Sequence, residues 1–173
     1  MPHPKADEQA RAEFRARLEA HRAEGRPVVH LDESGFAQDA PRASGYAPRG
    51  ERCPGRRDWQ ARGRVNALGA LLGGLLLTVS LMAGSVNAGM FHLWVVGDLL
   101  PKLPPGCVVV MDNASFHKRA DIRRAIEEAG HILEFLPPSS PDLNPIEHKW
   151  ARAKAIRRRK RRSVDELFAD RSL

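Results

Sequence analysis

Apolar residues gather in short runs, separated by segments rich in Pro, Gly and charge. Residues 27–31 (PVVHL), 107–111 (CVVVM) and 132–136 (ILEFL) are three such runs. A run of this length and character is typical of a strand buried on both faces. An acid, Asp32 or Asp112, directly follows each of the first two runs. The pattern therefore predicts a sheet that presents two carboxylates at strand ends.

Residues 65–91 contain no Asp, Glu, Lys or Arg, and two structures fit such a segment. One is a membrane span, since residues 67–83 are mostly apolar. The other is a buried hairpin that turns at Gly73 and Gly74, between VNALGALL and LLLTVSLMA. Interspersed glycine and polar residues, and the missing aromatic belt, favour the hairpin. We therefore expect a protein with no membrane partner.

Helical patterns alternate with these strands. Residues 5–24 are rich in helix formers with few apolar positions, which predicts an exposed or partner-facing connector helix. Residues 87–100 and 117–129 also predict helices, whereas residues 37–64, rich in Pro, Gly and Arg, predict a long basic loop. The order of elements indicates an α/β fold, with a mixed central sheet and helices on both faces.

The start of the last helix has the clearest local signal. Asn144 can serve as its N-cap, Pro145 follows at the first turn, and Glu147 stands three residues after the cap. A helix beginning there places Glu147 in its first turn.

The composition is that of one ordinary folded domain: 173 residues, 42% hydrophobic and 28% charged. We expect a connector helix in residues 1–26, the domain in 27–162 and a tail in 163–173. The two cysteines, Cys53 and Cys107, form no CxxC pair, so the sequence predicts neither a zinc ribbon nor a disulfide framework. The N-terminus lacks an apolar signal core, and a cytoplasmic location is expected.

The formal net charge is +7, and much of the excess lies near the C-terminal end. No acid stands between Glu147 and Asp165, an interval crowded with Lys and Arg. Such a cationic block attracts polyanions, most commonly nucleic acid, although a solvated helix end is the alternative. The residues predicted to contact nucleic acid are Lys149, Arg152, Lys154, Arg157, Arg158, Arg159 and Lys160, together with His117 and Lys118.

Two buried carboxylates close together are costly unless a cation joins them. If the first and second acid-bearing strands are neighbours, their ends lie about 5 Å apart, so Asp32 and Asp112 can bridge one metal ion. Glu147 can hold a second. Oxygen ligands suit Mg²⁺ or Mn²⁺, and a pair of such ions clamps the oxygens of a phosphoryl displacement. The sequence therefore indicates phosphodiester cleavage.

Each acid also has a purely structural interpretation. Asp32 can be a strand-end turn residue, Asp112 can form an Asx turn with Asn113, and Glu147 can complete a capping box. Asp142 is a rival for the third acid, although it is better explained as the residue that opens a Pro-rich turn.

Three histidines stand near the acids: His30, His117 and His148. A mixed His and Asp zinc site is conceivable, but no pair has the spacing of an HExxH motif. His117 is better placed to touch phosphate or to orient an acid. Serine hydrolysis is disfavoured because GxSxG is absent.

Three segments in this order, HLDESGF, VVVMDNASFHK and LPPSSPDLNPIEHKWARAK, resemble the signature blocks of the DDE transposases of the mariner superfamily, in its bacterial insertion-sequence branch. GYAPRGER and GSVNAG also resemble that branch. The similarity runs from about Val28 to about Arg158, and 34 residues separate Asp112 from Glu147, as is typical there. One departure is Ser139, where the family usually has Tyr.

The resemblance implies an RNase H-like catalytic domain. Asp32, Asp112 and Glu147 would be the catalytic acids that hold two Mg²⁺ or Mn²⁺ ions, and the reaction would be DNA cleavage at insertion-sequence ends followed by strand transfer. Two alternatives remain open: an RNase H-like nuclease or resolvase without strand transfer, and a non-catalytic DNA-binding remnant.

Recognition of DNA ends is expected to need another segment. Members of this family usually read their ends with helix-turn-helix modules before the first catalytic Asp, but only 31 residues precede Asp32 here. Residues 5–24 have only Phe14 and Leu18 as large apolar side chains, too few for two packed helices. We therefore expect an upstream helix-turn-helix segment or protein, and a homodimer on DNA.

Overall fold

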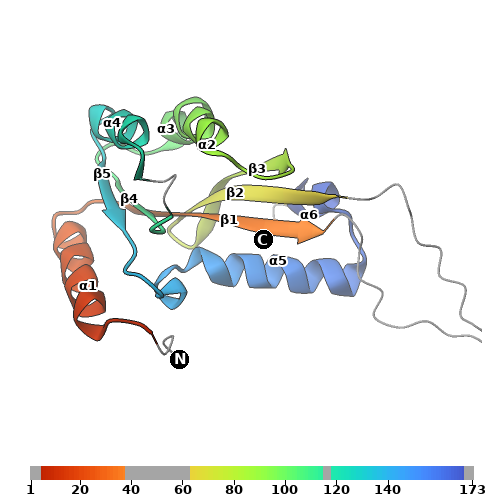
Figure 1. Cartoon of the computed structure of the whole chain (residues 1–173), viewed down its shortest axis with the longest axis horizontal. Helices are drawn as coiled ribbons and strands as arrows, with labels where there is room; N and C mark the ends of the chain where they lie inside the picture. The colour runs from red at the N-terminus through yellow and green to blue at the C-terminus, as the bar shows by residue number, and fades with distance from the viewer. Residues whose placement is uncertain (1–4, 38–62, 115–117, 170–173) are drawn as a thin grey trace, which may run out of the picture.

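The computed structural model describes residues 5–37, 63–114 and 118–169, and these contain one five-stranded sheet. The strand order is β3-β2-β1-β4-β5. The central strand β1 pairs antiparallel with β2 and parallel with β4, so the sheet is mixed, as predicted (Figure 1). The strands are β1 (Val28–Ala37), β2 (Arg64–Leu72), β3 (Leu75–Ala83), β4 (Val108–Met111) and β5 (Ile132–Phe135).

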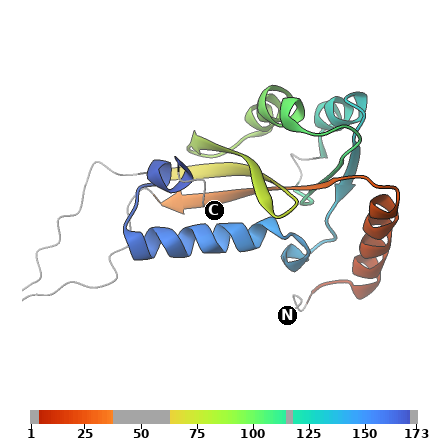
Figure 2. The ribbon, with the colours of Figure 1, turned by 180° about the vertical axis from the view of Figure 1, so that it is seen from behind.

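Helices cover both faces of the sheet, which confirms the predicted layering (Figures 1 and 2). On one face lie α2 (Ala88–Trp94), the π-helical turn η1 (Val95–Leu99), α3 (Leu100–Lys102) and α4 (Ala120–Glu128). On the other lie α1 (Glu8–Ala23), α5 (Ile146–Lys160) and α6 (Val164–Ala169), with a short 3-10 turn, η3 (Pro141–Leu143), before α5.

Alternation along β1 distributes its side chains between two cores. Val29 and Leu31 join the cluster beneath α2 and α4, with Phe91 and Ile122. Phe36 joins the opposite cluster, where Ile146, Trp150 and Ala153 of α5 pack with Val164 and Leu167 of α6. Asp32 and Phe36 share one face of β1, since they are four residues apart. The carboxylate of Asp32 is thus on the side of the sheet that α5 covers.

The predicted hairpin is confirmed. β2 and β3 are joined at Gly73 and Gly74, whose φ angles of 57° and 80° lie in the left-handed region that glycine adopts without strain. Within the described ranges, no helix has both the length and the apolarity that a membrane crossing requires.

The structure adds to one local prediction and corrects another. The helix over residues 5–24 forms and is exposed along most of its length, but it also packs on the sheet: Phe14 and Leu18 are buried against Val108 and Val110 of β4. Strand β1 does not end before Asp32, because β2 continues to pair with it as far as Ala37. The predicted loop of residues 37–64, with Cys53 and the GYAPRGER segment, lies almost wholly outside the described residues.

Candidate active site

The three predicted acids line one cavity of about 230 Å³, together with residues 136–141 and the start of α5. The topology brings two of them together: β4 runs parallel to β1, and their pairing ends at His30 opposite Val110, just before Asp32 and Asp112. Glu147 enters from the first turn of α5. Residues far apart in sequence thus converge at one edge of the β1–β4 pair.

Asp112 is held by its own turn. Its Oδ1 accepts a hydrogen bond of 3.0 Å from the backbone N–H of Ala114, the arrangement of an Asx turn around Asn113. The structural interpretation of Asp112 is therefore confirmed, and it coexists with a position in the cavity.

Asn144 does not cap α5, contrary to the prediction. Its Nδ2 donates instead to the carbonyl oxygen of Leu31, at 3.3 Å, and no side chain caps the helix start. The backbone N–H of Glu147 donates to the Asn144 carbonyl. The side-chain amide of Asn144 lies against β1 and binds it, which fastens the start of α5 to the strand that carries Asp32. Since no side chain caps α5, the capping-box interpretation of Glu147 is wrong.

Burial and neighbouring negative charges both disfavour the charged form of Asp32 in this cavity. Burial, reinforced by the negative charges of Glu147 and Asp112, raises the pKa of Asp32 to about 7. The groups that oppose this shift are neutral donors, the backbone N–H of Glu33 and the indole N–H of Trp150, which lies 3.0 Å from Asp32 Oδ2. A cation would relieve the repulsion among the three carboxylates.

The donor chemistry of the cavity fits Mg²⁺ or Mn²⁺, since it offers two carboxylates from the neighbouring segments of β1 and β4 and a third from the first turn of α5. In the described part of the chain, no three His, Cys, Asp or Glu side chains already stand at metal-ligand spacing.

The histidines do not enter this cavity where the structure describes them. His30 lines a separate cavity with Arg22 and Arg26, and burial together with the charge of Arg22 lowers its pKa to about 4. His148 is exposed on α5, and His117 lies outside the described residues. A mixed zinc site gains no support from the geometry.

Asp142, the rival third acid, has another partner. Both of its carboxylate oxygens accept hydrogen bonds from Arg11 of α1, at 2.9 and 2.7 Å. The hydrogen bond from Arg11 holds the pKa of Asp142 below its ordinary value. This ion pair ties α1 to the turn before α5, so Asp142 is structural.

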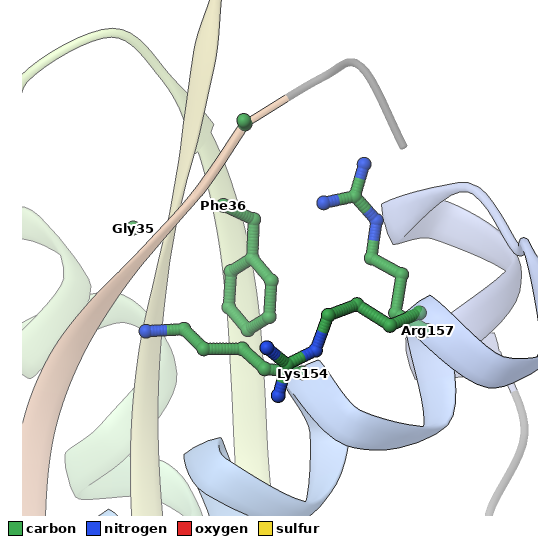
Figure 3. Close-up of a pocket in the computed structure, with 6 residues that line it drawn as sticks. Gly35, Phe36, Lys154 and Arg157 are labelled. Atoms are coloured by element: carbon green, nitrogen blue, oxygen red, sulfur yellow. The ribbon is translucent and has the colours of Figure 1, made fainter. Parts of the chain in front are cut away.

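The basic residues of α5 fall into two groups. Most are exposed or half-buried, whereas Arg157 is buried and its Nε donates to the Arg162 carbonyl, at 3.3 Å. Lys154, Arg157 and Arg158 line a cavity of about 230 Å³ beside Gly35 and Phe36 (Figure 3). Lys154 Nζ stands 5.4 Å from the centre of the Phe36 ring. Arg157, which the sequence predicted to contact DNA, is thus buried and hydrogen-bonded within the protein.

Sequence reasoning missed Trp150 and Gly69. A Cβ on Gly69 would come within 2.6 Å of the Trp150 ring, so only glycine allows the indole to lie there. A glycine within the predicted strand and a tryptophan three residues after Glu147 were the available signals.

An RNase H-like sheet that brings together carboxylates carried by its two central parallel strands is typical of metal-dependent nucleases and transposases. The family described as DDE superfamily endonuclease matches residues 27–167. The chain belongs to this family. Among curated proteins, none matches the sequence.

Solved structures of Mos1 transposase share the fold, which confirms the RNase H-like prediction. The paired-end complex with the left transposon end has a TM-score of 0.65 and 17% identity, over 91% of this chain and 51% of that one. For the paired-end complex with Mn the TM-score is 0.63, with 18% identity over 89% and 51%. For the catalytic domain the TM-score is 0.59, with 15% identity over 90% and 76%. This chain thus spans about half the length of Mos1 transposase as seen in the complexes.

Proposed function

We propose that this chain is the catalytic domain of a metal-dependent DNA transposase, with Asp32, Asp112 and Glu147 as its catalytic acids. The observation that carries the proposal is the convergence of the three acids on one cavity. There, burial and the negative charges of Glu147 and Asp112 raise the pKa of Asp32. Membership of the DDE endonuclease family supports it. So does the fold shared with Mos1 transposase, which has also been crystallised as a strand transfer complex.

The three acids would hold two Mg²⁺ or Mn²⁺ ions, with Asp32 and Asp112 sharing one and Asp32 and Glu147 holding the other. Such ions, when bound, activate the attacking oxygen and neutralise charge on the leaving oxygen. In the first step a water oxygen bonds to phosphorus at the element's end, and the 3′ oxygen leaves and takes up a proton. In the second step that 3′-hydroxyl attacks a target phosphate and releases a target 3′-hydroxyl.

DNA would approach along α5. Lys149, Arg152 and Lys154 follow Glu147 on this helix, and with Arg158, Arg159 and Lys160 they form its proposed DNA-contacting set. Lys154 and Arg158 line a cavity beside Phe36, and their charges would attract a phosphate group there. His117, which lies outside the described residues, and the exposed Lys118 would add contacts beside Asp112.

The proposal also covers how the ends of the element are recognised, how the chain assembles on DNA and from what kind of element it derives. The matched Mos1 structures include complexes with a transposon end, and each is about twice as long as the part matched here. We assign sequence recognition to an upstream helix-turn-helix segment or protein, and expect a homodimer on DNA. An insertion-sequence origin and a cytoplasmic location complete the hypothesis.

A product gel tests the proposal. The chain is incubated with labelled DNA that carries an element end, with supercoiled target DNA and with Mn²⁺. Cleaved product together with joined product supports a transposase. Cleavage without joining would indicate a nuclease or resolvase, and DNA binding without either product would indicate a non-catalytic remnant. Asp32→Asn is the matched inactive control.

A further inference from the structure

The indole of Trp150 is held in one position by its neighbours. The indole is 2% exposed. A Cβ added to Gly69 would stand only 2.6 Å from its Cη2 atom and 2.8 Å from its Cζ2 atom. The rings of Phe36 and Phe168 meet it edge to face, with centroids at 6.3 and 6.1 Å. Such contacts leave the ring no freedom to tilt without displacing a strand or another aromatic ring.

This fixed ring aims its one polar atom at the cavity. Trp150 Nε1 donates to Asp32 Oδ2 at 3.0 Å. Gly69 is the residue paired with Asp32 across β1 and β2. The glycine that makes room for the indole therefore stands directly opposite the carboxylate that the indole contacts.

A second contact fastens the same two elements. Asn144 Nδ2 donates to the carbonyl oxygen of Leu31, the residue before Asp32. Along the chain Asn144 and Trp150 lie three residues before and three residues after Glu147. The two hydrogen bonds thus start from residues on either side of Glu147 and end on the adjacent residues Leu31 and Asp32 of β1. Together they set the position of Glu147 relative to Asp32.

We propose that Trp150 is a positioning residue that holds the Asp32 carboxylate in the orientation required for metal binding. A neutral donor suits this task because it fixes the carboxylate plane without adding a positive charge that would compete with the metal ion. The inference rests on the proposed function, since it requires Asp32 to be a metal ligand.

The test is Mn²⁺ binding by the full chain, measured by titration calorimetry, with Trp150→Phe as the variant. Loss of an outer partner of a metal ligand typically weakens metal affinity about 10- to 100-fold. We expect a loss of about tenfold or more. Trp94→Phe is the matched control, because Trp94 is also buried and its Nε1 donates to Ser80, at 3.1 Å, on the other face of the sheet. Its affinity should stay within about twofold of wild type.

A second pair of variants covers the case in which Trp150→Phe does not fold. Gly69→Ala keeps the indole but pushes it from its place, and should weaken Mn²⁺ binding as well. Gly97→Ala is its control, since an added Cβ there meets nothing within 4 Å. In ¹⁵N spectra of the wild type, Mn²⁺ should broaden the indole signal of Trp150 more strongly than that of Trp94.

The outcomes separate the two proposals. If Asp32→Asn abolishes Mn²⁺ binding but Trp150→Phe and Gly69→Ala bind like their controls, Trp150 has only a packing role and the inference is wrong. If wild type and Asp32→Asn bind Mn²⁺ equally or not at all, the proposed metal site falls, and the inference with it.

Discussion

Two partly buried aspartates on opposite faces of the same sheet have opposite surroundings. Asp98, on η1, accepts hydrogen bonds from Thr78 and Ser80 of β3 and from Lys102, whose Nζ lies 2.6 Å away. Burial alone would raise the pKa of Asp98, but these hydrogen bonds outweigh it and hold the pKa below its ordinary value. On the other face, burial and two neighbouring acids raise the pKa of Asp32 to about 7.

The difference distinguishes a structural acid from a ligand. The charge of Asp98 is balanced by a lysine one helical turn away, so it fastens η1 to the edge strand β3. Near Asp32 negative charge accumulates, and the groups that donate hydrogen bonds to it, the backbone N–H of Glu33 and the indole of Trp150, are neutral. If the three acids hold metal ions as proposed, folding leaves a repulsive arrangement at the site where the cations bind, a common compromise between stability and function.

The largest expected effect follows from removing the accumulated charge. Asp32→Asn, Asp112→Asn and Glu147→Gln should each reduce Mg²⁺- or Mn²⁺-dependent DNA cleavage to background, since each variant removes a metal ligand and little volume. Asp98→Asn should retain cleavage. Full activity in any of the three pocket variants, purified and folded, would remove that residue from the site.

Without metal, replacement of Asp32 and replacement of Asp98 should change the free energy of unfolding in opposite directions. Asp32→Asn should raise the free energy of unfolding by about 1–2 kcal/mol, because it relieves repulsion within the cavity. Asp98→Asn should lower it by about 1–3 kcal/mol, because it breaks a hydrogen-bonded ion pair. Urea unfolding in EDTA measures both. A less stable Asp32→Asn protein would contradict the comparison.

The same contrast between unbalanced and balanced charge holds for the helices α5 and α4, which cover opposite faces of the sheet. On α5 the exposed cations have no acid among them, whereas Arg123 on α4 is paired with Glu127, at 3.1 Å. Replacing Arg158, Arg159 and Lys160 by Ser should weaken non-specific DNA binding about tenfold at low salt, and should lower the slope of log K against log[salt] by about 0.9 for each lost phosphate contact. Fluorescence anisotropy measures both. The control, Arg123→Ser with Arg124→Ser, should change binding less.

The smallest effect concerns the balanced pair of Asp142 and Arg11. Because Arg11 lowers the pKa of Asp142 below 3.8, the pair stabilises the fold above that pH, and its contribution is lost as the pH falls through the lowered value. Wild type should therefore be more stable than Asp142→Asn at pH 6, and the difference should shrink as the pH falls through the lowered pKa of Asp142. The variant should still cleave DNA. Loss of cleavage in a folded Asp142→Asn protein would reinstate it as the third acid.

Much of the fold could be predicted because its signals are local. The glycine pair between two apolar runs predicted the hairpin, the β-branched run predicted β4, and helical spacing predicted α2. The capping prediction at Asn144 was wrong because a tertiary partner, the Leu31 carbonyl, competes for its amide. Residues 5–24 form a helix that is exposed along most of its length, as predicted, but the sequence did not show that Phe14 and Leu18 bury one side of it against β4.

The sequence by itself determined that Asp32 and Asp112 directly follow apolar strand runs and that Glu147 stands in the first turn of a helix, because motifs and apolar runs are properties of neighbouring residues. Only the tertiary structure decided how those acids are held. Trp150 and Asp32 stand 118 positions apart in the chain, and their hydrogen bond exists because α5 packs over the strand pair at Gly69. Arg157 looks like its neighbours in sequence, but packing of α5 buries it and leaves Arg158 exposed. Contacts between distant segments depend on the shape of the whole core, which no local pattern specifies.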